Sequence, residues 1–101
     1  MTAATTNPPD AIRLSEQDNV AVAVRDIAAG SAVAIGEIRL TTLDAVPLGH
    51  KISLRPIRAG EKILKFGVPV GSATVDIAAG CHVHMHNVRS DYLNNRQEHW
   101  E

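Results

Sequence analysis

The sequence of 101 residues predicts a single all-β domain, built of short strands joined by glycine and proline turns. Two observations carry this prediction. The hydrophobic residues are mostly Val, Ile, Ala and Leu, with one Phe, one Tyr and one Trp, and β-branched residues favour strands. These residues also fall in brief runs that Gly or Pro separate, a punctuation typical of strands and turns.

The first predicted strand begins at Val20, where Val and Ala alternate as far as Arg25. A period of two turns one face of a strand inward. Further short apolar runs, rich in β-branched residues, are predicted as strands over residues 32–40, 52–54, 63–66, 68–70 and 73–77.

A short motif, I-x-A-G-x-x-[VI], recurs three times, beginning at Ile27, Ile57 and Ile77. In each copy the Ile is expected to end one strand inside the core, and the Gly supplies a tight turn with positive φ before the next strand. Isolated glycines between strands do not form the clustered cradle that binds phosphate ahead of a helix. We therefore interpret the copies as turns, and their unequal spacing argues against a solenoid.

The predicted domain spans residues 12–89. Residues 1–11 are polar, lack the features of a signal sequence and are predicted to be a disordered leader. Residues 90–101 are predicted to form a tail with a short helical turn that Ser90 or Asp91 caps. Apolar side chains in this tail would pack either on the domain itself or on another chain.

Charge and cysteine content exclude several classes of protein. Ten Lys and Arg residues nearly balance eleven Asp and Glu residues, and no basic cluster stands out, so neither nucleic acid nor a membrane is an expected partner. No segment is long and apolar enough to span a bilayer. The single cysteine, Cys81, argues against a disulfide-stabilised secreted domain, and we expect a cytoplasmic protein.

The segment 81–88, with the sequence CHVHMHNV, alternates histidines with small or apolar residues. As a strand it would send Cys81, Val83 and Met85 into the core. Cys81 would then be a small hydrophobic residue and not a nucleophile. The opposite face would carry the imidazoles of His82, His84 and His86.

Imidazole is the commonest side-chain ligand of transition metals and titrates near neutral pH, so these histidines predict a metal site or a proton-transfer site. In a straight strand, neighbouring histidines would lie roughly 7 Å apart at Cα and the outer pair roughly 13 Å apart. Two could share an ion, but a third ligand would have to come from elsewhere. The candidates are His50, Asp44, Asp76 or another subunit. The alternative is that the histidines are solvated and bind nothing.

A second polar group follows the turn predicted at Pro47 and Gly49. His50 could be a metal ligand or an acid–base group there, and Lys51 could bind a substrate carboxylate. Lys65 interrupts an apolar run, so it could face solvent or reach an anionic ligand. The alternative for His50 and Lys51 is a loop tip with two solvated side chains.

Taken in order, the segments PLGHKI, ILKFG, VG and HVHMHN resemble the small SAF-type domain of the altronate/galactarate dehydratase family; they lie at residues 47–52, 63–67, 70–71 and 82–87. The likeness runs from about residue 18 to residue 88. It implies a β-clip fold and the small subunit of a sugar-acid dehydratase, a hydro-lyase that a large catalytic subunit completes. The small subunit of (2R)-sulfolactate sulfo-lyase, which eliminates sulfite, shares the pattern. The chain departs from the family in carrying Phe66 where Tyr is common and Cys81 before the histidines.

The resemblance also implies chemistry. Dehydration of a 2,3-dihydroxy acid removes the proton α to the carboxylate and expels the β-hydroxyl, and the family is linked to Fe(II), for which another divalent metal could substitute as Lewis acid. The base that takes the α-proton is expected on the large subunit. The implied roles are catalytic for His50, His84 and His86, metal-binding for His82, His84 and His86, and substrate-binding for Lys51, Lys65 and Asn87.

Two alternatives belong to other classes. The chain could be a non-catalytic module that binds a small anion or a metal, in which case the isolated chain would have measurable ligand affinity. It could instead be a histidine-strand metal protein that acts alone, which requires a complete ligand set in this chain. The isolated chain could also form a homo-oligomer.

Overall fold

The computed structural model describes residues 9–91, which form an all-β structure as predicted. The strands in chain order are β1 (Ala11–Ile12), β2 (Val20–Ala23), β3 (Ala32–Ile35), β4 (Ile38–Thr41), β5 (Lys51–Ser53), β6 (Lys62–Lys65), β7 (Val68–Ala73), β8 (His82–Val83) and β9 (Val88–Arg89). Within this range no helix has the length and apolar character that crossing a bilayer requires. Residues 1–8 of the predicted leader and residues 92–101 of the predicted tail lie outside the described residues.

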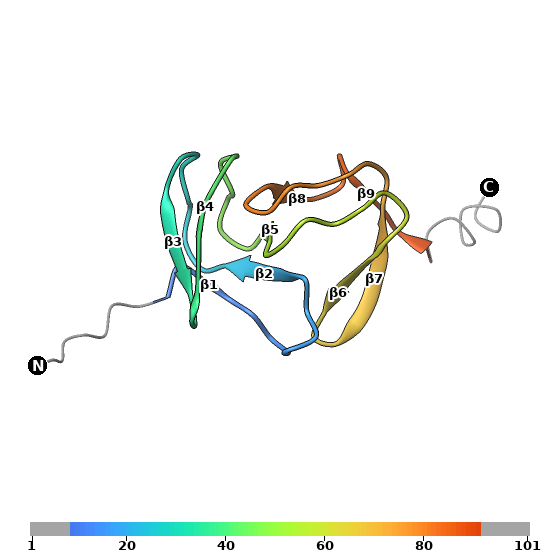
Figure 1. Ribbon diagram of the computed structural model, residues 1–101, viewed down its shortest axis with the longest axis horizontal. Coiled ribbons are helices and arrows are strands. Elements are labelled where there is room, and N and C mark those ends of the chain that lie inside the picture. The colour runs from blue at the N-terminus through green and yellow to red at the C-terminus, as the bar shows by residue number, and fades with distance from the viewer. Residues whose placement is uncertain (1–8, 92–101) are drawn as a thin grey trace, which may run out of the picture.

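The strands form three antiparallel sheets, with the largest sheet between two hairpins (Figure 1). The central sheet has the order β1-β2-β5-β8. The hairpin β3-β4 lies on one side of it, and the sheet β6-β7-β9 lies on the other. Because β5 pairs antiparallel with β8, with Lys51 opposite Val83, the start of β5 lies beside the end of β8.

Two buried apolar clusters pack against the central sheet. Strand β2 contributes Ala21 and Ala23 to the first cluster and Val20 to the second. The prediction of a single inward face for this strand is therefore wrong, because β2 lies between the two hairpins and both of its faces are covered. The first cluster contains Ala11, Ala21, Ala23, Ile27, Val33, Ile35, Val46 and Ile52, and the second contains Val20, Ile57, Ile63, Ala73, Ile77 and Val83.

The recurring motif forms tight turns, as predicted. Its Ile residues are buried, and the glycine of every copy has a φ between 80° and 88°. The segment Val46 to Gly49 is a fourth copy that the motif search missed, because Val and Leu replace Ile and Ala. Single bridges join the turns in pairs, Ile27 with Val46 and Ile57 with Ile77.

Other predicted strands are present with changed bounds. The run over residues 32–40 is two strands, β3 and β4, which reverse direction at Gly36. The predicted strand over residues 73–77 is mostly loop, since β7 ends at its first residue and Ile77 makes only a single bridge. The runs over residues 52–54 and 63–66 correspond to β5 and β6, each shifted by one residue.

The turn between β6 and β7 is strained. Phe66 has a φ of 63°, and it is the one non-glycine residue with positive φ in the described part of the chain. The buried carboxylate of Asp18 accepts hydrogen bonds from the N–H groups of Phe66 (2.8 Å) and Gly67 (2.7 Å). Backbone strain of this kind persists when surrounding contacts fix it. Asp18 thereby fixes the end of β6, where Lys65 lies.

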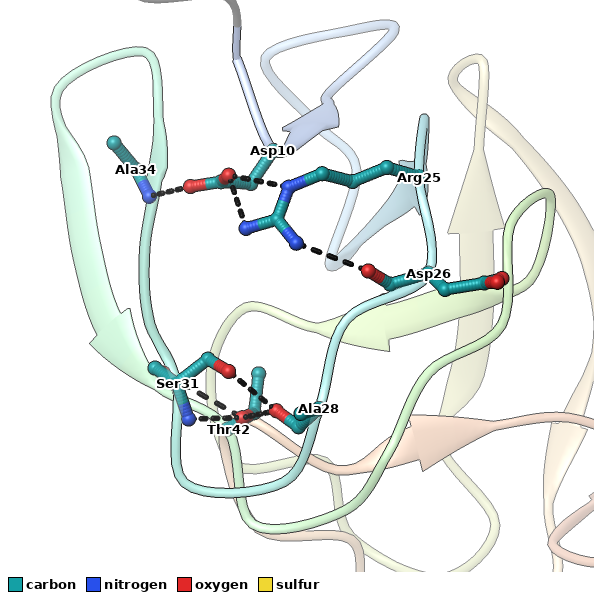
Figure 2. Close-up of polar contacts among 7 residues, drawn as sticks. All are labelled: Asp10, Arg25, Asp26, Ala28, Ser31, Ala34 and Thr42. Atoms are coloured by element: carbon teal, nitrogen blue, oxygen red, sulfur yellow. Dashed lines mark hydrogen bonds and ion pairs between the residues drawn. The ribbon is translucent and has the colours of Figure 1, made fainter.

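An exposed ion pair joins the N-terminal segment to Arg25, just after β2, and a hydrogen bond joins the same segment to β3 (Figure 2). Asp10 accepts hydrogen bonds from the N–H of Ala34 (2.9 Å) and from the guanidinium of Arg25 (2.6 Å and 3.0 Å). Ala11 is buried and pairs with Ala23. The domain therefore includes Asp10 and Ala11, which were predicted to belong to the leader over residues 1–11. The sequence did not reveal this strand because two residues are too few to show a periodic pattern.

Candidate functional site

The histidine segment is a short strand followed by a turn. Strand β8 ends at Val83, and residues 84–87 turn back toward β9. Val83 is fully buried as predicted, but Met85 is 81% exposed, so its predicted place in the core is wrong. Cys81, also predicted to be core, is half-buried.

The side chain of Asn87 explains why the strand ends before Met85. Its Oδ1 accepts a hydrogen bond from the N–H of His84 (2.9 Å), and the N–H of Asn87 donates to the carbonyl of His84 (3.1 Å). Asn side chains that bond the nearby backbone in this way stabilise turns at the expense of strands. The alternation of residues 81–88 therefore does not continue past Val83.

The turn brings histidines from two segments together. His50 follows the turn at residues 46–49, and the pairing of β5 with β8 places it beside His82 and His84. The ring centroids of His50 and His84 are 4.1 Å apart, and those of His50 and His82 are 5.0 Å apart. His50 Nδ1 lies 2.8 Å from His82 Nε2. One ring nitrogen from each histidine lies within 4.8 Å of the other two.

The structure places some of the candidate metal ligands in the histidine cluster and others outside it. Of the three residues considered as an additional ligand, His50 lies in the cluster. Asp44 binds the N–H of His82 (3.0 Å), and Asp76 binds the N–H of Ala59 (2.8 Å) in another turn. The ring of His86 lies 5.1 Å from that of His82, outside the three-nitrogen group.

The donor set of His50, His82 and His84 fits a divalent transition metal. Metal–nitrogen bonds of about 2.1 Å place two ligand nitrogens at most about 4.2 Å apart, so small side-chain movements would close this group around an ion. Three imidazoles suit Fe, Zn, Cu or Ni, and they leave coordination positions for oxygen ligands.

The environment of His82 and His84 favours their neutral imidazoles. Partial burial lowers the pKa of His82, and the neighbouring His86, His50 and His84 lower it further, while Asp44 opposes the shift. The pKa of His84 is lowered by desolvation first, then by His50, Lys51 and His86. Neutral rings have lone pairs available to bind a metal or accept a proton.

Lys51 adds positive charge beside the histidines. Burial lowers the pKa of Lys51, and the charge of Lys65 lowers it further. Among residues 9–91 the ion pairs involve other cations, and neither lysine has a carboxylate partner. Lys51 also lowers the pKa of His84. The three histidines and Lys51 are therefore suited to an anion, and Lys65 adds positive charge that acts on Lys51.

Asn87 lies beneath this cluster. It is 7% exposed, and its side chain bonds the backbone of both His82 and His84. Its role in substrate binding stays a prediction. Sequence reasoning missed that Asn87 and Asp44 hold the histidine backbone, because both contacts depend on tertiary placement.

Comparison with protein families matches the chain to the altronate/galactarate dehydratase SAF domain over residues 9–91. The match covers both segments that carry the histidine cluster.

Individual relatives are of two kinds. The chain is 44% identical over 80 residues to altronate dehydratase of Escherichia coli K12 and 38% identical over 80 residues to that of Bacillus subtilis 168. Both alignments cover 79% of this chain but 16% of the relative, so the chain spans a small part of those proteins. It is also 35% identical over 54 residues to (2R)-sulfolactate sulfo-lyase subunit alpha of Paracoccus pantotrophus, covering 54% of this chain and 81% of that subunit.

Proposed function

Because the chain belongs to the altronate/galactarate dehydratase SAF domain family, we propose that it is the small subunit of a sugar-acid dehydratase. This lyase would eliminate water from a 2,3-dihydroxy acid together with a large catalytic subunit. The observation that carries the proposal is the gathering of His50, His82 and His84 beside Lys51. Neither Lys51 nor Lys65, whose charge acts on Lys51, has a carboxylate ion-pair partner among the described residues.

The two lysines are suited to bind the substrate carboxylate. Removal of the α-proton moves negative charge onto the carboxylate oxygens, and fixed positive groups stabilise that charge where it develops. The partial burial of Lys51 strengthens such an interaction, because less water screens it. Lys65 lies at the end of β6, a position that the Asp18 contacts fix.

The histidines are suited to proton transfer and to contacts with substrate oxygens. The β-hydroxyl must receive a proton to leave as water, and imidazole is the side chain that most often transfers protons near neutral pH. We assign this transfer to His86, which lies beside His82 and outside the three-nitrogen group, because an imidazole that binds a metal is not free to transfer the proton. His50 and His84, which stack on each other, would act through the metal.

A divalent metal such as Fe(II) belongs to the proposal. His50, His82 and His84 would hold it, which replaces His86 of the predicted ligand set with His50. When bound, the metal would supply Lewis-acid polarisation of the carboxylate and hydroxyl oxygens.

The remaining parts of the active site are assigned to a large subunit. The matched segment makes up 16% of the altronate dehydratases, so most of those proteins has no counterpart in this chain. The base that removes the α-proton is placed there. The unpaired thiol of Cys81 supports a reducing, cytoplasmic setting for the complex.

A second candidate reaction is the elimination of sulfite from (2R)-sulfolactate. The alignment covers 81% of a sulfo-lyase subunit, so that relative is a small chain of matching extent. Lys51 and Lys65 would accept a sulfonate as readily as a carboxylate, because both are compact anions. The two reactions share the abstraction of the α-proton and differ in the leaving group.

The test combines the chain with a large dehydratase-like chain encoded near it, and screens aldonates, aldarates and sulfolactate with and without Fe(II). We expect turnover only with both chains. His50→Ala and His84→Ala should lower kcat by about 100-fold or more, and Lys51→Met should raise KM by about tenfold. His99→Ala, outside the matched residues 9–91, is the control.

Full turnover by the His84→Ala complex would contradict the proposed roles. If no acid is converted with any partner chain, while the isolated chain binds sugar acids in calorimetric titrations, the chain is a binding module and the lyase proposal is wrong.

A further inference from the structure

Two side chains form hydrogen bonds with the backbone at the free edge of β8. This strand lies at the edge of the central sheet, so the N–H and C=O of His82 that point away from β5 have no strand partner. Asp44 Oδ2 accepts a hydrogen bond from the N–H of His82 (3.0 Å), and Asn87 Nδ2 donates to the carbonyl of His82 (2.9 Å). Both free backbone groups of this histidine are therefore held by residues distant from the strand.

Asn87 also fixes His84. Its side chain and its own N–H bond the backbone N–H and C=O of His84, and its carbonyl accepts a hydrogen bond from the N–H of Thr74 (3.0 Å), just after β7. The nearly buried side-chain amide thus ties His82 and His84 to each other, and the backbone carbonyl of Asn87 ties them to the segment after β7. None of these hydrogen bonds uses an imidazole ring.

Asp44 connects the other segment of the cluster. It lies in the loop that leads into the turn before His50, and its neighbour Leu43 donates its N–H to the carbonyl of Gly80 (2.9 Å). The two contacts join the loop that carries His50 to the strand that carries His82. Asp44 therefore adds a second connection between these segments, beside the pairing of β5 with β8.

We propose that Asp44 and Asn87 are positioning residues, which set the mutual placement of the imidazoles of His50, His82 and His84. The proposal deepens the metal role in the proposed function and rests on it for its effect on ion binding. Loss of groups that orient metal ligands typically costs 10–100-fold in metal affinity. The rings of His50 and His82 also contact each other directly, with 2.8 Å between Nδ1 and Nε2, so the backbone contacts of Asp44 and Asn87 add to this ring contact.

The first experiment titrates the full chain with Co(II), followed by the absorbance of the bound ion. Asp44→Ala and Asn87→Ala should weaken binding by about 10–100-fold. Asp44→Asn retains an oxygen acceptor for the His82 N–H and should restore affinity to within about threefold of wild type. The matched control is Asp76→Ala, which removes an equivalent carboxylate-to-backbone bond from the turn at Ala59, away from the histidines.

The second experiment needs no metal. In histidine-labelled chain, nuclear Overhauser contacts between the rings of His50 and His84, whose centroids are 4.1 Å apart, report the placement directly. These contacts should disappear in Asn87→Ala and persist in Asp76→Ala. If Asn87→Ala does not fold, Asp44→Ala and Asp44→Asn decide by the contact between His50 and His82.

The two readouts separate the two proposals. If wild-type chain binds no Co(II) but the ring contacts respond as described, the metal role is wrong and the positioning role stands. If wild-type chain binds Co(II) and Asp44→Ala and Asn87→Ala change neither affinity nor ring contacts, the positioning role is wrong and the metal site stands.

Discussion

Two turns with the same hydrogen bonds lead into strands that carry different side chains. The turn at residues 27–30 leads into β3, and the turn at residues 77–80 leads into β8. In the first, the hydroxyl of Thr42 donates to the carbonyl of Ala28 (2.8 Å) and accepts a hydrogen bond from the N–H of Ser31 (2.8 Å) (Figure 2).

The second turn repeats these bonds with Ser53 in place of Thr42. Its hydroxyl donates to the carbonyl of Ala78 (2.6 Å) and accepts a hydrogen bond from the N–H of Cys81 (3.0 Å). The glycine N–H also makes the same bond in both turns: Gly30 donates to the carbonyl of Thr42, and Gly80 donates to the carbonyl of Ser53. The turns thus have one hydrogen-bonding scheme.

The strands after the two turns differ in what flanks the buried residue. Val33 and Val83 are both buried, but alanines stand at positions 32 and 34 and histidines at positions 82 and 84. The shared bonds and the buried Val therefore stabilise this unit whichever side chains flank it. We conclude that the fold does not require the histidines, which supports a functional reason for their presence.

The largest expected effect follows from making the second strand like the first. The double substitution His82→Ala and His84→Ala should lower Co(II) affinity by at least about 100-fold, since two of three proposed ligands are lost. The midpoint of thermal unfolding should change by no more than about 4 °C. Metal titration and calorimetric melting measure the two quantities. A large loss of stability would show that the two strands are not equivalent.

The glycines of the two turns should differ in their tolerance of a side chain. A Cβ at Gly80 would overlap the carbonyl oxygen of Thr41, whereas a Cβ at Gly30 would meet no atom within 4 Å. Both residues have positive φ, which costs an alanine about 1–2 kcal/mol. We expect Gly30→Ala to lose about that amount and Gly80→Ala to lose at least about 3 kcal/mol, because overpacking adds to the strain. Urea unfolding measures both, and equal losses would contradict the difference in packing.

The two hydroxyl residues should be equivalent. Thr42 and Ser53 are both buried and both bond one carbonyl and one N–H. Thr42→Val and Ser53→Ala leave those groups unpaired, so each should lose about 2 kcal/mol of unfolding free energy. The same denaturant titration serves here. A loss in one variant alone would indicate that water replaces the hydroxyl in the other.

Local signals in the sequence predicted the turns well, and tertiary contacts explain the failures. A glycine between two branched apolar residues predicts a positive-φ turn without knowledge of the rest of the fold. The inward faces of β2 could not be predicted, because they depend on the hairpins on both sides. Met85 was misplaced because the Asn87 side chain ends the strand.

The candidate site was predictable in composition and not in geometry. Sequence spacing favoured two ligands from one strand and named His50 among three possible additions, whereas the family resemblance implied His82, His84 and His86 as ligands. Only the pairing of β5 with β8 distinguishes His50 from Asp44 and Asp76. The selection of ligands therefore depends on sheet topology, which the motif cannot encode.

The smallest expected effect concerns the two side chains that accept hydrogen bonds from the backbone of Ala34 in β3 and of His84 just after β8. The N–H of Ala34 bonds the carboxylate of Asp10, and the N–H of His84 bonds the neutral amide of Asn87, so only the first contact should depend on pH. The hydrogen bond from Ala34 holds the pKa of Asp10 below its ordinary value of 3.8, and Arg25 adds to this shift. A lowered pKa contributes stability above pH 3.8 that is lost as the pH falls through the folded value.

Asp10→Asn tests this difference, because it keeps an acceptor for Ala34 and removes the charge. At pH 7 we expect a loss of about 0.5 kcal/mol, since the Arg25 side chain is half exposed and water screens the pair. As the pH falls through the lowered pKa of Asp10, wild type and variant should converge in unfolding free energy, because the wild-type carboxylate becomes protonated as well. Urea titrations at pH 7 and at decreasing acid pH measure the gap. A gap that stays constant would show that the charge of Asp10 contributes nothing and that the two strands are held by equivalent neutral contacts.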